Sequence, residues 1–140
     1  MRTTLLGIAA ALWVAGCATA GSLDDTRAKA PDRVVSDAFN HSFDRVYAAA
    51  RLSCLDLDLA IEKEDRQRGR IYAKSSPNMA KVVVYKTGFG EHVGVYVTKI
   101  DDQKTKVEVV TQKSNRLEVG YKDYRRIILK LIRPRLEGLA

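Results

Sequence analysis

The sequence has two cysteines, Cys17 and Cys54, and two histidines, His41 and His92, and both residue types are common in nucleophilic and metal sites. Neither histidine stands at a spacing from a Cys, Asp or Glu that is typical of a metal site. Cys54 has no catalytic signature around it, and a Cys–His pair would have to be assembled by the fold. We therefore expect no metal, no cofactor and no enzymatic activity.

Cys54 and the Glu91–His92 pair are the remaining candidates for an enzyme site. Cys54 shares one face of a predicted helix with apolar residues, which is typical of a small buried side chain rather than a reactive thiol. The Gly88–His92 loop leads into a strand, whereas a phosphate-binding loop leads into the N-terminus of a helix. Hairpin geometry explains its glycines, so an enzyme is the least supported of the hypotheses considered.

Cys17 stands at the end of a segment with the pattern of an export signal. Arg2 supplies a positive start, and the run from Leu5 to Ala15 is apolar and uncharged. The residues Val14, Ala15, Gly16 and Cys17 resemble the lipobox of bacterial lipoproteins. That resemblance implies cleavage before Cys17 and transfer of a diacylglyceryl group to its thiol. Because Ala18 follows instead of Asp, it also implies transfer to the periplasmic face of the outer membrane in a Gram-negative host.

Two other interpretations of the N-terminus stay open. The small residues Ala18-Thr19-Ala20 also fit a signal-peptidase site, which would release a soluble protein beginning at Gly21. A permanent membrane helix is the weaker alternative, because spanning a bilayer takes about 20 apolar residues. The lipoprotein interpretation is favoured over both.

The predicted domain organisation is a signal peptide over residues 1–16, a lipidated cysteine with a flexible tether over 17–32, and a single domain over 33–140. The tether prediction depends on small, polar and charged residues without apolar periodicity. Lys and Arg number 24 and Asp and Glu number 17, a net charge of +7, so the domain is basic. Export argues against nucleic acid as its partner.

Apolar spacing along residues 33–140 predicts an α+β fold. A short strand over 33–39 precedes a helix that begins near Phe43, with Ser42 as its N-cap. Alternating apolar residues predict strands from Leu57 to Ala73, with a Gly-containing turn, and further strands over 81–86, 93–100 and 106–113. A last helix begins near Lys122 and is kinked or ended by Pro134. The expected architecture is a four- to five-stranded antiparallel sheet with both helices on one face, a two-layer sandwich.

Two segments of this pattern carry a looser resemblance. The segment Phe43-Asp44-Arg45-Val46-Tyr47, and the later one from Ile61 through Gly69-Arg70-Ile71, are similar to the BamC-type domains of outer-membrane assembly lipoproteins and to other small envelope lipoproteins. The resemblance covers roughly Arg33 to Leu136. It implies an α+β domain and transfers no functional residue.

The sequence offers two candidate interaction surfaces. One is the basic face of the last helix, which anionic lipid head groups or an acidic partner would fit: Lys122, Arg125, Arg126, Lys130 and Arg133. The other is the sheet face away from the helices, where Tyr72, Tyr85 and Tyr96 form an aromatic patch unless they cap the core. We expect a non-catalytic, membrane-anchored lipoprotein that binds an envelope protein. The alternative is a lipid- or small-ligand-binding module.

Overall fold

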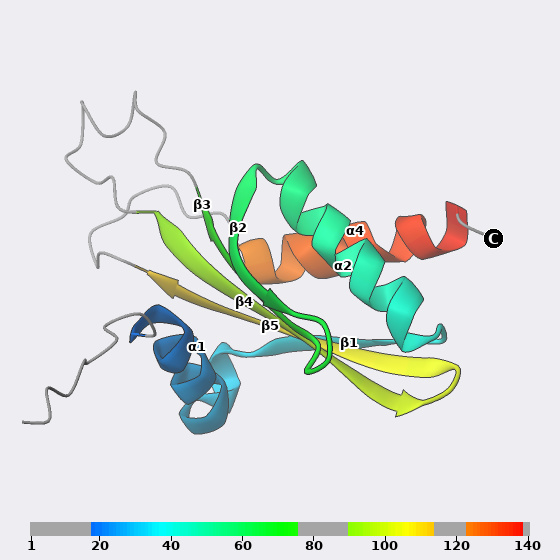
Figure 1. Cartoon of the computed structure of the whole chain (residues 1–140), viewed down its shortest axis with the longest axis horizontal. Coiled ribbons are helices and arrows are strands. Elements are labelled where there is room, and N and C mark those ends of the chain that lie inside the picture. The colour runs from blue at the N-terminus through cyan, green and yellow to red at the C-terminus, as the bar shows by residue number, and fades with distance from the viewer. Residues whose placement is uncertain (1–17, 76–89, 114–122, 139–140) are drawn as a thin grey trace, which may run out of the picture.

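The structure is a computed structural model and describes residues 18–75, 90–113 and 123–138. The elements in chain order are α1 (Ala18–Lys29), the 3-10 helix η1 (Pro31–Arg33), β1 (Val35–Phe39), α2 (Phe43–Asp56), β2 (Leu59–Asp65), β3 (Arg70–Ser75), β4 (Glu91–Asp101), β5 (Lys104–Lys113) and α4 (Tyr124–Gly138). The strands form one five-stranded antiparallel sheet in the order β1-β5-β4-β3-β2. Figure 1 shows α2 and α4 on one side of this sheet and α1 on the other.

Helix α2 forms where apolar residues recur at steps of three and four. Ser42 precedes it with the extended backbone of an N-cap, φ −62° and ψ 154°. The buried side of the helix carries Val46 and Cys54, both 0% exposed. The predicted start at Phe43 is therefore confirmed, and the apolar face packs on the sheet.

The turn between β2 and β3 requires glycine. Gly69 has φ +66°, and a Cβ at this position would overlap the carbonyl oxygen of Val97. The amide of Val97 in turn donates to the carbonyl oxygen of Gly69 at 2.7 Å. The predicted Gly-containing turn is confirmed, and this hydrogen bond joins it to the neighbouring strand β4.

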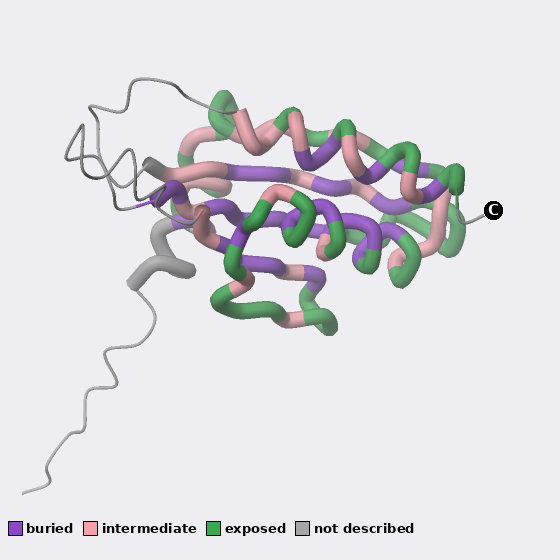
Figure 2. Tube along the Cα trace, turned by 90° about the horizontal axis from the view of Figure 1, so that it is seen from above, coloured by how far each residue is buried: buried purple, intermediate pink, exposed green. Residues whose placement is uncertain are grey.

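The main core lies between the sheet and the helices α2 and α4. Valines that alternate along β4 and β5 point to this side and are 0–2% exposed: Val93, Val95, Val97, Val107 and Val109. Figure 2 shows buried stretches in the interior of the domain and exposed residues on its outer turns. The predicted α+β fold, with two helices packed on one face of an antiparallel sheet, is confirmed.

Helix α4 continues through Pro134 instead of ending there. It extends to Gly138, and Leu136, which is 1% exposed, anchors the segment after the proline. Pro134 itself is exposed. Proline removes one helical hydrogen bond, and burial of Leu136 offsets that loss.

The prediction of a flexible tether over residues 17–32 is wrong for the part that the structure describes. Residues 18–29 form α1, and Leu23 of this helix is only 2% exposed. Polar composition suggested a solvated linker, but Leu23 packs against the sheet, and Asp24 and Arg27 bond to it as well. The folded domain therefore begins before residue 33.

No helix in the described parts of the chain is both long and apolar enough to span a bilayer.

Candidate functional site

The sheet face opposite α2 and α4 carries a second, smaller core beneath α1. Leu23 packs there with Tyr72 of β3, Tyr96 of β4 and Val110 of β5, and Val34 borders the cluster. Full burial of one leucine side chain stabilises by about 1.5–3 kcal/mol. Leu23 is the one fully buried side chain among residues 23–29, so it is the main apolar contact of this helix segment.

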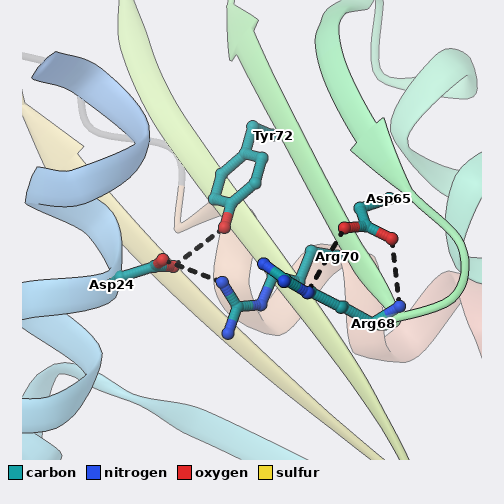
Figure 3. Close-up of polar contacts among 5 residues, drawn as sticks. All are labelled: Asp24, Asp65, Arg68, Arg70 and Tyr72. Carbon is teal, nitrogen blue, oxygen red and sulfur yellow. Dashed lines mark hydrogen bonds and ion pairs between the residues drawn. The ribbon is translucent and has the colours of Figure 1, made fainter. Parts of the chain in front are cut away.

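Asp24, the next residue of α1, accepts three hydrogen bonds from the sheet. Its Oδ1 atom accepts from the hydroxyls of Tyr72 at 2.9 Å and Tyr96 at 2.6 Å. Its Oδ2 atom accepts from the guanidinium of Arg70 at 3.1 Å. Figure 3 shows Tyr72 and Arg70 converging on the Asp24 carboxylate from the strands. Hydrogen bonds to a charged group are worth about 1.5–3 kcal/mol when buried, and the 36% exposure of the Asp24 side chain reduces that value.

The two tyrosines are held in place by each other and by their surroundings. Their rings meet edge to face at 89°, with centroids 6.1 Å apart. Burial, and after it the hydrogen bond to Asp24, raises the pKa of both phenols. The hydroxyls therefore remain protonated donors at neutral pH, which is the form that binds a carboxylate.

Arg27, one helical turn after Leu23, makes the third contact between α1 and the sheet. Its guanidinium lies over the ring of Tyr96, 4.4 Å from the centroid, and donates to Glu108 of β5. Lys106 also approaches Glu108, with Nζ 3.3 Å from Oε1. Burial alone would raise the pKa of Glu108. The hydrogen bond from Arg27 and the positive charges of Arg27 and Lys106 outweigh burial, so the pKa is lowered. The carboxylate is therefore charged and pairs with α1.

A surface cavity of about 360 Å³ opens beside these contacts. It is lined by Asp24, Arg27, Ala28, Arg70 and Glu108. The lining carries two guanidinium groups and two carboxylates, so it can hold a polar or charged group by hydrogen bonding.

Three cations of the predicted basic face of α4 form ion pairs within the domain, and two of them, Arg126 and Arg133, keep 73% and 59% of their side chains exposed. Arg125 donates to Asp123 at 2.9 Å and to the carbonyl oxygen of Arg33 at 2.9 Å. Arg126 pairs with the same Asp123 at 3.4 Å. Arg133 donates to Asp37 at 2.8 Å. Lys130 is exposed, and Lys122 lies outside the described residues.

The structure places the candidate catalytic groups Cys54 and His92 in α2 and in β4. Cys54 is 0% exposed, and burial raises the pKa of its thiol to about 12. His92 lies in β4, and its Nδ1 atom is 3.9 Å from Glu62. Burial, and after it the charge of Lys74, lowers the pKa of His92. Within the described ranges no three His, Cys, Asp or Glu side chains gather as a metal site.

The tyrosine prediction and the α1 contacts together define the site. Tyr72 and Tyr96 lie on the sheet face away from α2 and α4, as one interpretation of the sequence predicted, whereas Tyr85 falls outside the described residues. The patch is covered by α1 and is not exposed. Sequence patterns did not predict roles for Asp24 and Arg27, because a polar segment with one leucine shows no helical periodicity. The available signal for a contact with the domain was the apolar Leu23 directly before Asp24.

No protein-family model and no curated protein matches this chain. Solved structures that resemble it include the di-domain ARO/CYC StfQ from the steffimycin biosynthetic pathway, with a TM-score of 0.49 and 10% identity. That match covers 76% of this chain, which spans only 44% of the StfQ chain. TTHA0849 from Thermus thermophilus has a TM-score of 0.41 at 9% identity, covering 76% of this chain and 97% of its own. Ara h 8.0201 has a TM-score of 0.33 at 10% identity, with coverage of 76% and 94%. No residue role follows from these similarities.

Proposed function

We propose that this chain is a lipid-anchored, non-catalytic lipoprotein of the bacterial envelope, whose α+β domain serves as a protein-interaction or structural accessory. The lipobox resemblance of Val14, Ala15, Gly16 and Cys17 supports the anchor. In a Gram-negative host, Ala18 in place of Asp supports location on the periplasmic face of the outer membrane. The role in interaction rests on the surface beneath α1.

The observation that carries the proposal is the docking of α1 directly after the cysteine. Ala18 is the first residue of the helix, and Leu23 and Asp24 fasten that helix to the sheet. At 1.5 Å per helical residue, the path from Ala18 to Asp24 is about 9 Å. A lipid on Cys17 would therefore hold the domain close to the head groups, instead of at the end of a long tether.

The chemistry of the described residues supports a non-catalytic role. The Cys54 thiol is buried and its pKa is raised, so it is neither accessible nor ionised at neutral pH. The charged groups beneath α1 are engaged with one another as donors and acceptors.

Intact mass spectrometry of the protein from bacterial membranes tests the anchor. We expect a diacylglyceryl-plus-acyl mass on a chain that begins at Cys17, and its loss, with loss of membrane fractionation, in Cys17→Ala. Cys54→Ser is the matched control, because it removes the other cysteine and should leave the lipid mass unchanged. An unlipidated wild-type chain beginning at Gly21 would refute the anchor.

The cavity beneath α1 favours a second candidate function, the binding of a small ligand. Its charged lining fits a polar molecule better than an acyl chain. Native mass spectrometry of the protein purified from envelopes tests this function. A small molecule that copurifies with the wild-type chain and is lost in Arg70→Met would support it, and a ligand retained in that variant would refute this location.

A further inference from the structure

Two of the residues that line the cavity beside α1 belong to one row of side chains across three strands. Arg70 of β3 lies directly opposite Tyr96 of β4, and Tyr96 lies directly opposite Glu108 of β5. Directly paired residues share one face of a sheet, so these three side chains stand on the side that α1 covers. The row places a guanidinium at one end and a carboxylate at the other.

Helix α1 brings the opposite charge to each end of this row. Asp24 accepts a hydrogen bond from Arg70, and Arg27 donates to Glu108. Asp24 and Arg27 are three positions apart, so they lie on the same side of the helix. Ala28, whose side chain is a single methyl group, completes the lining. The cavity of about 360 Å³ is therefore bordered by four charged groups that hold one another in place.

Both carboxylates of the lining are already bound by donors. Asp24 accepts from two tyrosine hydroxyls through Oδ1 and from Arg70 through Oδ2. Glu108 accepts from Arg27 through Oε2, and its Oε1 atom lies 3.3 Å from Nζ of Lys106. Three cations therefore surround two carboxylates, which leaves a positive local charge. An incoming cation would have to compete for acceptor oxygens that these donors occupy.

The two guanidinium groups, in contrast, keep capacity for a ligand. Arginine carries five N–H donors. Arg70 donates to Asp24 through Nη1 and also bonds to Tyr72, and Arg27 donates to Glu108 through Nη2. Within the part of the chain that the structure describes, these contacts use only some of the donors. Both arginine side chains are 33% exposed, so a molecule in the cavity can reach them.

We propose that this cavity binds a small anion through a carboxylate or phosphate group, and that Arg27 and Arg70 are the residues that contact it. Guanidinium groups match both anions with paired N–H donors. The volume is at the lower end of the range for small-molecule sites, about 300–1,000 Å³, which suits a metabolite or a lipid head group. This inference rests on the ligand-binding function proposed above as the second candidate.

Nuclear magnetic resonance titration of the full chain in a neutral detergent tests the site. The probes are inorganic phosphate and dihexanoylphosphatidylglycerol, at an ionic strength held constant with sodium chloride. We expect saturable shifts of the Nε–H signals of Arg27 and Arg70 with at least one probe. Tighter binding of the phosphatidylglycerol would assign the site to lipid head groups, and tighter binding of inorganic phosphate would assign it to free anions.

Variants that keep the charge test the contact itself. Arg27→Lys and Arg70→Lys preserve a cation beside each carboxylate but remove the guanidinium, so binding of the preferred probe should weaken about fivefold or more. Arg126→Lys is the matched control, because Arg126 is 73% exposed and lies on α4, across the sheet from the cavity; binding should change less than about twofold. Glu108→Gln removes a negative charge from the lining and should strengthen binding about threefold, whereas damage to the cavity would weaken it.

Three results would overturn the inference. The first is the absence of a saturable shift with both probes, and the second is equal weakening by Arg70→Lys and Arg126→Lys. The third is weaker binding in a Glu108→Gln chain that circular dichroism shows to be folded. A neutral or cationic molecule that copurifies with the wild-type chain and is lost in Arg70→Met would also overturn the anion assignment. That last result would leave the ligand-binding function intact, so the two failures are distinguishable.

Discussion

Replacement of Leu23 by Ala tests whether one apolar side chain holds α1 on the sheet. Leu23 is 2% exposed and packs against Tyr72, Tyr96 and Val110. Leu→Ala substitutions at buried sites destabilise by about 2–5 kcal/mol, depending on how far the surroundings relax. A helix at the surface can settle into the vacated space, so we expect α1 docking to weaken by about 2–3 kcal/mol.

Hydrogen exchange read by mass spectrometry measures this loss locally. The apolar contact of α1 lies in a cluster separate from the main core, so we expect α1 to open without unfolding of the sheet and its amides to report the docking equilibrium. A loss of about 2–3 kcal/mol corresponds to exchange about 30- to 150-fold faster in α1. Amides of β4, which lie in the centre of the sheet, should change little.

Leu136→Ala is the matched control, because Leu136 is 1% exposed and lies in the core on the other face. It should lower the free energy of unfolding of the whole domain without selectively accelerating α1. If Leu23→Ala leaves α1 exchange unchanged, or accelerates β4 as much as α1, the view of α1 as a separately docked helix is refuted.

Three further predictions concern the core, the pH dependence and the β2–β3 turn. The Cys54 thiol should not react with Ellman's reagent in the folded chain and should react fully in guanidinium; rapid labelling of folded protein would contradict its burial. Burial raises the pKa of Cys54 from 9.0 to about 12, so the folded chain keeps a proton that the unfolded chain releases. The free energy of unfolding of the wild-type chain minus that of Cys54→Ala, both measured with urea, should therefore be constant below about pH 9 and fall as pH rises from there towards 12. Equal slopes in the two proteins would refute that assignment. Gly69→Ala should destabilise the domain by at least about 2 kcal/mol, because residue 69 has φ +66° and the new Cβ would overlap Val97. Gly138→Ala is the control: a Cβ there would meet no neighbouring atom within 4 Å, so the melting temperature should stay almost unchanged. Similar melting temperatures for the two variants would contradict the account of the turn.

Local patterns predicted most of the main fold because each element has its own hydrophobic period. The spacing of Val46 and Cys54 indicated a helix, and the alternation of Val93, Val95 and Val97 indicated a strand with one buried face. A Gly at position 69, after a run of charged residues, indicated the turn. These signals act within a few residues, so they can be read without knowledge of the partner elements.

The candidate site required contacts between residues that are distant in sequence. Asp24 and its donor Tyr96 are separated by 72 positions, and Arg27 and Glu108 by 81. No local period marks such pairs, because their attraction depends on the sheet bringing β3, β4 and β5 side by side. The amino-acid sequence by itself determined the alternation that builds the sheet, and it predicts the lipid anchor from a resemblance to a lipobox at Cys17. Only the tertiary structure decided that the polar segment after Cys17 is a docked helix, because one buried leucine and one three-donor carboxylate outweigh its lack of periodicity.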